Sequence, residues 1–562
     1  MKVIKFSKLM ITLTLAVSVV LAIACSSESV SAPAAQAPAP YPTAAPVPAA
    51  PAPTAVTSAA VVPVAATDLG PKYGGTLRWA HHLDYDVLDP AYQLLVPSRR
   101  VMYTLFSSLV QMMPDSSIGP ELARSWDVSA DGKTITFKLA EGAKFHDGTP
   151  ADANAVKYNF DRFMDPTVGS PRGKDLAPSL DRIEVVDSTT VKMILKKPFR
   201  PIMQLLSIRT GQMASPTALK ATNSYSDRNG DFGSHPVGSG MFKFKEWLPA
   251  QRIVVERNKD YFEEGLPYLD EIRFLQIPDN RVIFAMLRTG ELEAQENIVP
   301  GDYEIAKRNP RVKIIRQDGA RGRAIYFKTN VAPWDSKALR QAFAMGIDRE
   351  TIVDVVYDGL AEQAFSPIYS SFGVYHDPSF DLLKYDPEGA KAKLAEAGYP
   401  NGFKYNQPCR ASSFEMEYCE VAQAMLKKSG IDMQIQPWDN RTYFSDWVAG
   451  KYDEGTWAGY RARIDPDVML RSFLHSDGSR NTMQRTAYRN PAFDAVLDEA
   501  VGVYDASKAA SLYKKALEIM VPDVPIALQV AETLLYGLNI DVRNFHTRPD
   551  AESRVRDLWL DR

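Results

Sequence analysis

Residues 457–467 bring together side chains that could bind a charged small molecule. Arg461 and Arg463 carry planar guanidinium groups, which pair with carboxylate or phosphonate groups through two parallel hydrogen bonds. Trp457 and Tyr460 are close to them in the sequence, and aromatic rings offer a ligand much contact area with few rotors to immobilise. We therefore predict that these four residues contact an anionic or amphipathic ligand.

Two other interpretations of this segment stay open. The arginines can instead form salt bridges that only shape the loop, since three acids are near them in the sequence, namely Asp453, Asp465 and Asp467. Trp457 can belong to a hydrophobic core, which is common for tryptophan in a region of strands and loops. The sequence alone does not choose between ligand binding and these structural roles.

The sequence offers little support for catalysis. It contains no Gly-x-Ser-x-Gly elbow, no Walker loop, no His-Glu-x-x-His motif and no zinc-spaced cysteines, and it has only seven histidines. His81 and His82 are adjacent in an expected strand, so their side chains point to opposite faces and make a poor metal site. We predict no catalytic residue, no metal and no cofactor; the alternative is a secreted hydrolase, glycosidase-like, with paired carboxylates among Asp84, Asp86 and Asp89.

The N-terminal segment predicts export and lipid attachment. Three lysines precede an apolar run over residues 9–24, which is typical of a signal peptide over residues 1–24 and short for a spanning helix. Residues 21–25, LAIAC, resemble the lipobox of bacterial lipoproteins, so Cys25 is the predicted lipid attachment site. An uncleaved signal anchor is the alternative.

Residues 25–72 are expected to form a disordered tether between this anchor and a folded body. After Cys25 the composition is dominated by Ala, Pro, Val, Ser and Thr, which cannot bury enough surface to offset the entropy of ordering. The whole chain of 562 residues has a net charge of −3, so it lacks the basic excess that binding to nucleic acid requires. If Cys25 is acylated, Cys409 and Cys419 remain as a pair, for which a disulfide and two buried thiols are both open.

Periodicity in the body predicts a mixture of strands and helices. Residues 134–139 alternate polar and apolar side chains, and residues 183–186 and 191–195 look like a hairpin. Helices are expected after Asp335-Ser336, where Leu339, Phe343 and Ile347 recur at helical spacing, after Asp386-Pro387, and over residues 415–428, with a strand following at 431–435. Strands and helices in both halves argue for a mixed α/β architecture.

Several motifs occur in an order that resembles a known family. They include PELARSW at 120–126, DGKTITFKL at 131–139, KFHDGTP at 144–150, AVKYNFDR at 155–162, PVGSG at 236–240, YFKTN at 326–330, LRQAF at 339–343, YDPE at 385–388 and DVPI at 523–526. Together they resemble the family 5 extracellular solute-binding proteins, which are the dipeptide-, oligopeptide- and nickel-binding receptors of ABC importers. The resemblance covers the chain from Tyr73 to its C-terminus.

This resemblance implies a two-lobed periplasmic-binding-protein type II fold with an extra subdomain in lobe one. Lobe one would comprise residues 73–322 and 531–562, and lobe two residues 323–530, with the solute enclosed between them by hinge closure. The implied partners are a small peptide-like or other amphipathic solute, the permease subunits of an ABC importer, and the membrane through the N-terminal lipid. We expect an exported monomer on the outer face of the cytoplasmic membrane, at the cell surface or in the periplasm, that binds no nucleic acid.

The segment that begins at Trp457 departs from the family pattern. Peptide-binding members carry Trp-x-x-Asp here, and the Asp pairs with the α-ammonium of the peptide; in this chain Tyr460 or Arg461 takes that place. Recognition of unmodified peptides is therefore in doubt, and an anionic solute is favoured. The resemblance also places one wall of the cleft just after the first strand, where Tyr85 is the predicted contact. A surface sensor that uses the same cleft is a further alternative.

Overall fold

The computed structural model describes residues 70–562 except 114–116, 412, 440–441, 444–445, 447–450, 452–455, 462–464, 479, 482–485 and 549–552. The signal peptide, Cys25 and nearly all of the expected tether lie outside the described residues. Residues 69–562 form one compact unit of mixed α and β structure. No helix in the described part of the chain combines the length and the apolar character that crossing a bilayer requires.

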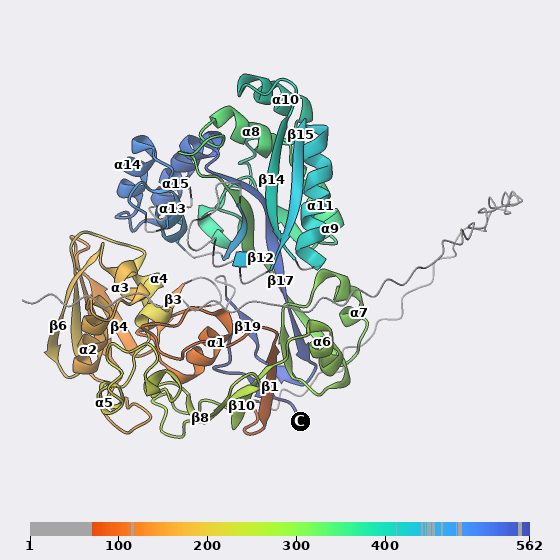
Figure 1. Cartoon of the computed structure of the whole chain (residues 1–562). Helices are drawn as coiled ribbons and strands as arrows, with labels where there is room; N and C mark the ends of the chain where they lie inside the picture. The colour runs from red at the N-terminus through yellow and green to blue at the C-terminus, as the bar shows by residue number, and fades with distance from the viewer. Residues whose placement is uncertain are drawn as a thin grey trace, which may run out of the picture. The chain divides into compact units, whose positions relative to one another are not determined.

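A nine-stranded mixed sheet forms the backbone of the molecule (Figure 1). The strand order is β16-β12-β17-β11-β1-β10-β9-β8, and β13 also pairs with β17. The strands are β1 Thr76–His81, β8 Phe242–Leu248, β9 Arg252–Arg257, β10 Glu271–Gln276, β11 Ala294–Glu296, β12 Val312–Tyr326, β13 Ala361–Gln363, β16 Thr456–Arg461 and β17 Ile526–Asn539. Because β12 and β17 are long and antiparallel, they join the strands on one side of the sheet to those on the other.

Strands β12 and β17 change partners midway along their length. Their first register pairs Val312 with Asn539, next to β11, and after a shift at Gln317 the second register pairs Arg321 with Glu532, next to β13 and β16. The expected boundaries at 322/323 and 530/531 therefore fall inside these two strands. We use "first lobe" for residues 73–322 with 531–562 and "second lobe" for residues 323–530.

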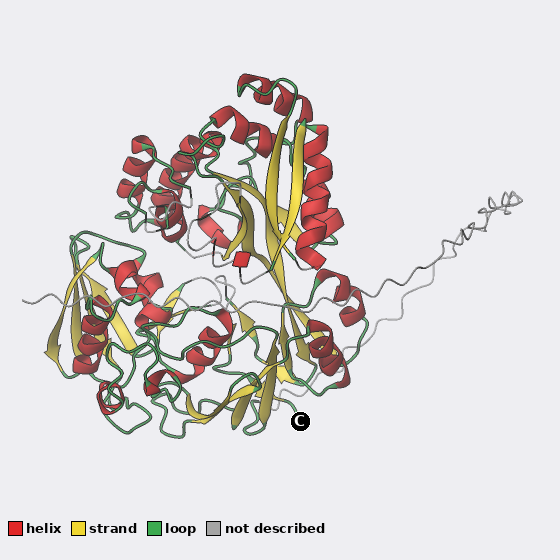
Figure 2. Ribbon diagram, in the orientation of Figure 1, coloured by secondary structure: helices red, strands yellow, loops and turns green. Residues whose placement is uncertain are grey.

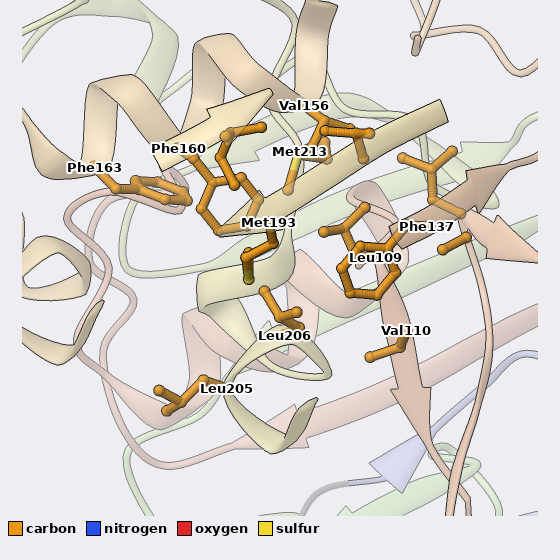
Figure 3. Packing of buried hydrophobic residues seen from close by; sticks show 14 of the residues in the cluster. Leu109, Val110, Phe137, Val156, Phe160, Phe163, Met193, Leu205, Leu206 and Met213 are labelled. Atoms are coloured by element: carbon orange, nitrogen blue, oxygen red, sulfur yellow. The ribbon is translucent and has the colours of Figure 1, made fainter. Parts of the chain in front are cut away.

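The first lobe contains a separate four-stranded sheet, ordered β4-β5-β7-β6. Its strands are β4 Ala123–Val128, β5 Thr134–Leu139, β6 Leu180–Asp187 and β7 Thr190–Leu195, so the predicted strand and hairpin are confirmed. Helix α2, Ala153–Met164, covers this sheet because its apolar side chains Val156, Phe160 and Phe163 pack on Phe137 and Met193 (Figure 3). We call residues 108–240 the insert subdomain.

Short helices and hairpins complete the first lobe. The helices are α1 Val96–Leu105, α3 Pro171–Leu176, α4 Ile202–Leu206, α5 Pro216–Ala221, α6 Asn280–Thr289 and α7 Tyr303–Lys307. The two-stranded pairs are β2 Val110–Met112 with β3 Ile118–Pro120, β18 Val542–Arg543 with β21 Trp559–Leu560, and β19 His546–Thr547 with β20 Ser553–Arg554. A core around Trp79, Phe274 and Tyr536 holds β1, β10 and β17 together.

In the second lobe, helices flank the strands (Figure 2). The parallel pair β14 Phe403–Arg410 and β15 Ile431–Trp438 packs against α11 Ser413–Lys428. The other helices are α8 Lys337–Met345, α9 Arg349–Val356, α10 Pro387–Glu396, α13 Pro466–Leu474, α14 Pro491–Ala500 and α15 Ala506–Met520. The predicted helices and strand are confirmed, except that α8 ends before Ile347, because the chain leaves the helix at Gly346.

The turn KFHDGTP at residues 144–150 contains a buried histidine, His146. The imidazole of His146 lies 3.0 Å from the carbonyl oxygen of Gly240 through Nε2, and its Nδ1 accepts from the backbone N–H of Gly238 at 3.3 Å. Both contacts suit the neutral ring, and burial lowers the pKa of His146 to about 4. Protonation would place a second hydrogen against the Gly238 amide.

We therefore expect acid to destabilise the protein through His146. In the unfolded chain the pKa of histidine is about 6.5, so the unfolded state takes up a proton first as the pH falls. Stability should decline from about pH 6.5 towards pH 4, with a loss of up to about 2 kcal/mol at pH 5. Urea unfolding as a function of pH measures this loss. The His146→Asn variant should show a smaller loss over the same range, and an equal loss would contradict the assignment.

Candidate functional site

Strand β16 places three of the predicted contact residues beside the central strand β12. Their Cα atoms lie in register with this strand: Trp457 faces Ile325, Tyr460 faces Gly322 and Arg461 faces Arg321. Arg463 lies outside the described residues. The site residues of β16 thus stand at the edge of the large sheet, where the two lobes join.

An ionic cluster lies beside β16, on residues of β12, β17, β14 and α11. Arg323 of β12 is 3% exposed and binds two carboxylates: Glu415 of α11 through two hydrogen bonds of 2.7 and 3.0 Å, and Glu532 of β17 at 3.0 Å. Arg321 also pairs with Glu532, and Arg410 of β14 pairs with Glu415. We call these five residues the hinge cluster.

The hinge cluster has more positive than negative groups among the described residues, since three guanidinium groups share two carboxylates. Burial opposes ionisation of Glu532, but Arg321 and Arg323 lower its pKa to about 2. Burial and the positive charges of Arg323 and Arg321 lower the pKa of Arg410, against the attraction of Glu415. A further anion would therefore be stabilised here.

Two arginines of the cluster reach solvent. The side chain of Arg321 is 44% exposed and that of Arg410 is 27% exposed, whereas Arg323 is enclosed by the rings of Tyr418 and Phe414. The charge of Arg321 also acts on the loop after β1: burial lowers the pKa of His82, Glu296 opposes this, and the charge of Arg321 lowers it further. Arg321 and Arg410 are thus the members of the cluster that could bind a solute.

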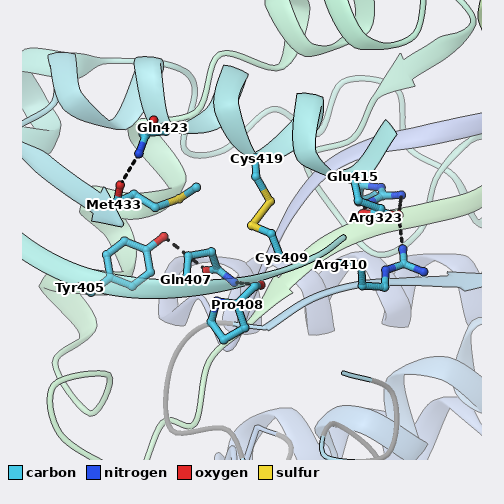
Figure 4. Close-up of a disulfide and its surroundings, with 10 residues drawn as sticks. All are labelled: Arg323, Tyr405, Gln407, Pro408, Cys409, Arg410, Glu415, Cys419, Gln423 and Met433. Carbon is cyan, nitrogen blue, oxygen red and sulfur yellow. Dashed lines mark hydrogen bonds and ion pairs between the residues drawn. A yellow bond between two sulfur atoms is a disulfide. The ribbon is translucent and has the colours of Figure 1, made fainter. Parts of the chain in front are cut away.

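A disulfide holds Arg410 in place. It joins Cys409, the residue before Arg410, to Cys419 of α11, and Glu415 lies between the two cysteines along the chain (Figure 4). The bond therefore closes a loop that contains the Arg410–Glu415 ion pair. It fixes the end of β14 against α11.

Removing this disulfide should reduce stability. The cysteines are 10 positions apart, and freeing a loop of that size adds unfolded-state entropy worth about 2–3 kcal/mol. Denaturant unfolding of a Cys409→Ser, Cys419→Ser double variant measures the loss. Dithiothreitol should lower the stability of the unsubstituted protein and leave the double variant unchanged; equal stability of the two proteins under oxidising conditions would contradict this expectation.

The loop after β1 supplies Tyr85 from the first lobe. Its ring makes an edge contact with His81 at 6.1 Å, and its buried hydroxyl has no hydrogen-bond partner among the described residues. Burial raises the pKa of Tyr85, so the hydroxyl keeps its proton. The hydroxyl is therefore available as a hydrogen-bond donor.

The three acids of this loop have structural partners. Asp89 pairs with Arg162 through bonds of 2.9 and 2.7 Å, Asp86 accepts from two backbone amides, and Asp84 accepts from Gln276. This arrangement does not support the hydrolase alternative, which needs two of these carboxylates facing a sugar. His81 contacts Arg100 at 2.8 Å, and no cluster of three metal-binding side chains occurs among the residues that the structure describes.

The structure shows the ion-pair partners of two of the acids that are near Arg461 and Arg463 in the sequence. Asp465 binds Arg200 through bonds of 2.7 and 2.9 Å, and Asp467 binds Arg471 through bonds of 2.9 and 3.1 Å. Two of the three acids that the sequence offered for loop-shaping salt bridges are thus engaged elsewhere. The third, Asp453, lies outside the described residues.

Sequence reasoning missed the hinge cluster and Arg200. Arg321 and Arg323 carry charge in a strand whose next residues, Ala324 to Phe327, are buried, and that contrast is the signal that could have indicated a site. The partners Glu415 and Glu532 are 92 and 209 positions away from Arg323, so nothing local identified them.

Comparison with known proteins agrees with this architecture. Residues 117–481 match the model of the "Bacterial extracellular solute-binding proteins, family 5 Middle". The "Glutathione-binding protein GsiB" of Shigella flexneri serotype 5b (strain 8401) is 30% identical over 485 residues, which cover 85% of this chain and 93% of that protein. The protein of the same name from Pectobacterium atrosepticum is 30% identical over 471 residues, covering 82% and 90%.

Solved structures show the same fold. The periplasmic binding protein DppA of Helicobacter pylori, in complex with the peptide STSA, has a TM-score of 0.79 at 25% identity, covering 87% of this chain and 99% of that one. The binding protein AgaA of A. tumefacien R10, in complex with agropinic acid, has a TM-score of 0.76 at 25% identity, with coverage of 87% and 99%. The chain therefore belongs to the bacterial extracellular solute-binding proteins, family 5.

Proposed function

We propose that this chain is the lipid-anchored receptor of an ABC importer for a small peptide-like solute that carries carboxylates. The solute would lie between the lobes, in contact with Tyr85, Trp457, Tyr460, Arg461 and Arg463, and would pass unchanged to the permease. The observation that carries the anionic preference is the uncompensated positive charge of the hinge cluster beside β16. Bidentate pairing of guanidinium with carboxylate is the recognition chemistry.

The named relatives support this class of solute. Glutathione is a peptide with two carboxylates and one ammonium group, and relatives that bear its name match nearly the whole folded body of this chain. Agropinic acid, the ligand in one of the similar structures, is also a carboxylic acid. Because the family's ammonium-binding Asp is replaced by Tyr460 or Arg461, a solute whose charges are mainly negative fits better than an unmodified cationic peptide.

A ligand screen on protein purified without denaturation tests the proposal. The panel would contain reduced glutathione, γ-glutamyl dipeptides, sugar–amino-acid conjugates, neutral dipeptides and a lysine-rich tripeptide. A carboxylate-rich member at 100 times its Kd should stabilise the protein by about 2.7 kcal/mol, seen as a raised Tm and as one-to-one binding in calorimetry. Stabilisation by the lysine-rich or neutral peptides alone would overturn the anionic assignment.

Anchoring and transport need separate tests. Mass spectrometry of the mature N-terminus should find an acylated Cys25, and Cys25→Ala should release the protein from the membrane fraction. Deleting the gene should abolish uptake of the radiolabelled solute that the screen identifies. Unchanged uptake would instead indicate a sensor, and an intact signal anchor would contradict lipid attachment.

A further inference from the structure

The insert subdomain of the first lobe contacts second-lobe residues in and next to the helices α13, α14 and α15. The segment before α4 supplies Arg200, and the start of α13 supplies Asp465, which is 265 positions later in the chain. Both side chains are nearly buried, with 10% and 7% exposure. This contact is an ion pair between the lobes, and no prediction from the sequence included it.

Arg200 uses all of its guanidinium nitrogens in this contact. Nε and Nη2 donate to the two carboxylate oxygens of Asp465 at 2.7 and 2.9 Å. Nη2 also donates to the hydroxyl of Tyr513 at 2.7 Å, and Nη1 donates to the carbonyl of Val503 at 2.8 Å. The rings of Tyr513 and Tyr375 lie 5.5 and 5.4 Å from the guanidinium carbon. All four partner residues belong to the second lobe, so the side chain of Arg200 contacts that lobe throughout its guanidinium group.

Three further hydrogen bonds between the lobes surround the pair. The amide of Arg200 donates to the carbonyl of Val501 at 3.0 Å, and the amide of Asp465 donates to Oε1 of Gln204 at 3.0 Å. Tyr504 of the second lobe reaches the carbonyl of Gly132 in the first lobe at 3.3 Å. We call the Arg200–Asp465 pair with these contacts the clasp.

The insert subdomain is fastened to the rest of the first lobe. Arg162 of α2 binds Asp89 in the loop after β1, Arg124 of β4 binds Glu263 at 2.9 Å, and Ser170 donates to the carbonyl of Ala91 at 2.7 Å. Arg200 therefore moves with the first lobe. A rotation that separates the lobes must break the clasp.

We infer that Arg200 is a positioning residue for solute capture: through the clasp it holds the lobes closed and fixes Asp465, which follows the strand β16 that carries Trp457, Tyr460 and Arg461. The role of that strand rests on the function proposed above, whereas the clasp itself stands on the contacts just given. Asp465 caps α13 by accepting from the amide of Asp467 at 3.0 Å, so the ion pair joins the first lobe to the helix that follows β16.

The physical basis is the cost of leaving a buried charge without its partner. With the lobes in contact, as in this structure, each charge is enclosed and satisfied, so removing one partner penalises this arrangement strongly. In the open form both groups face water, and the same substitution has little effect. Loss of Arg200 should therefore shift the equilibrium toward opening without unfolding either lobe.

Hydrogen exchange of the ligand-free full chain, followed by mass spectrometry, tests the clasp. In Arg200→Gln the amides of Arg200 and Asp465 should exchange at least about tenfold faster, because both are bonded across the lobes. The amides of β5, Thr134–Leu139, should keep their rates, since they are bonded within the insert subdomain. Arg200→Lys keeps the positive charge but not the paired guanidinium donors, so the exchange rates of these two amides should be intermediate.

Two variants separate the clasp from general destabilisation. Asp465→Asn keeps a side-chain oxygen that can cap α13. Combined with Arg200→Gln, it should accelerate exchange of the two interface amides no more than about threefold beyond Arg200→Gln alone. Arg471→Gln breaks a neighbouring arginine–carboxylate pair that lies wholly within the second lobe, and should leave the Arg200 amide unchanged. Unchanged interface exchange in Arg200→Gln, equal acceleration in β5, or equal acceleration in Arg471→Gln would each overturn the inference.

A second readout uses reduced glutathione as the probe. If it binds, Arg200→Gln should raise its dissociation rate at least about tenfold while changing its association rate less. A dissociation rate unchanged in that variant would overturn the positioning role. Absence of glutathione binding in the unsubstituted protein would count against that solute, and the exchange experiment would still decide the clasp.

Discussion

Replacing Arg162 with methionine should lower the free energy of unfolding by about 3–5 kcal/mol. The guanidinium of Arg162 is fully buried and binds both oxygens of Asp89, whose side chain is 2% exposed. It also donates to the carbonyls of Ser224 and Tyr225. The substitution would leave the Asp89 carboxylate charged, buried and without its arginine, and Asp89 belongs to the loop that carries Tyr85. Urea unfolding followed by tryptophan fluorescence measures the loss.

Two controls test the cause of this loss. Lys157 and Asp161 form an exposed ion pair in the same helix α2, so Lys157→Met should change stability by less than about 1 kcal/mol. Combining Arg162→Met with Asp89→Asn removes the stranded charge and should be less destabilising than Arg162→Met alone. A double variant that loses the sum of both single losses would contradict the ion-pair explanation.

Replacing Arg321 with glutamine should weaken binding of the carboxylate-bearing solute about 30-fold, which corresponds to about 2 kcal/mol. Arg321 is exposed, its charge acts on His82 in the loop after β1, and it stands in register with Arg461 of β16, so it is placed to meet an anion where the two lobes join. Removing its charge abolishes the positive surplus of the hinge cluster. Calorimetry with the solute identified by the ligand screen measures the change in Kd.

The fold should survive this substitution, which keeps the test interpretable. Glu532 would still bind Arg323 and the hydroxyl of Tyr357, so its charge stays compensated. The matched control is Arg316→Gln, since Arg316 lies on the same strand β12 but pairs with Asp318 at an exposed position of the first register. Equal losses of affinity in the two variants, or no loss in Arg321→Gln, would contradict a role for the hinge cluster in recognition.

Local patterns predicted most of the individual elements. Alternating polar and apolar residues indicate β5 because a half-buried strand exposes every second side chain, and the Asp386-Pro387 pair marks the start of α10, where Asp386 caps the amide of Gly389. Gly398, with a φ of +92°, follows the end of that helix, where glycine adopts a backbone conformation that other residues rarely take. Such signals act over a few residues and are visible in one sequence.

The site was predicted only in part. The ordered motifs indicated the family, and the departure at Tyr460 and Arg461 indicated a change of ligand charge; both inferences use residues near one another in the chain. The positions of Trp457, Tyr460 and Arg461 on β16, opposite β12, depend on strand pairing between segments more than a hundred residues apart. The contact of Tyr85, Trp457, Tyr460, Arg461 and Arg463 with a solute remains a prediction.

The sequence by itself determined the family, the mixed α/β class, the main strands and helices, and the expectation of an exported solute receptor. Only the tertiary structure decided which charges neutralise one another: Arg323 with Glu415 and Glu532, and Arg200 with Asp465. The physical reason is the separation along the chain over which each kind of interaction acts. Helix caps and strand alternation depend on neighbours within a few residues, whereas an ion pair depends on the distance between two side chains after the chain has folded, and that distance is independent of their separation in sequence.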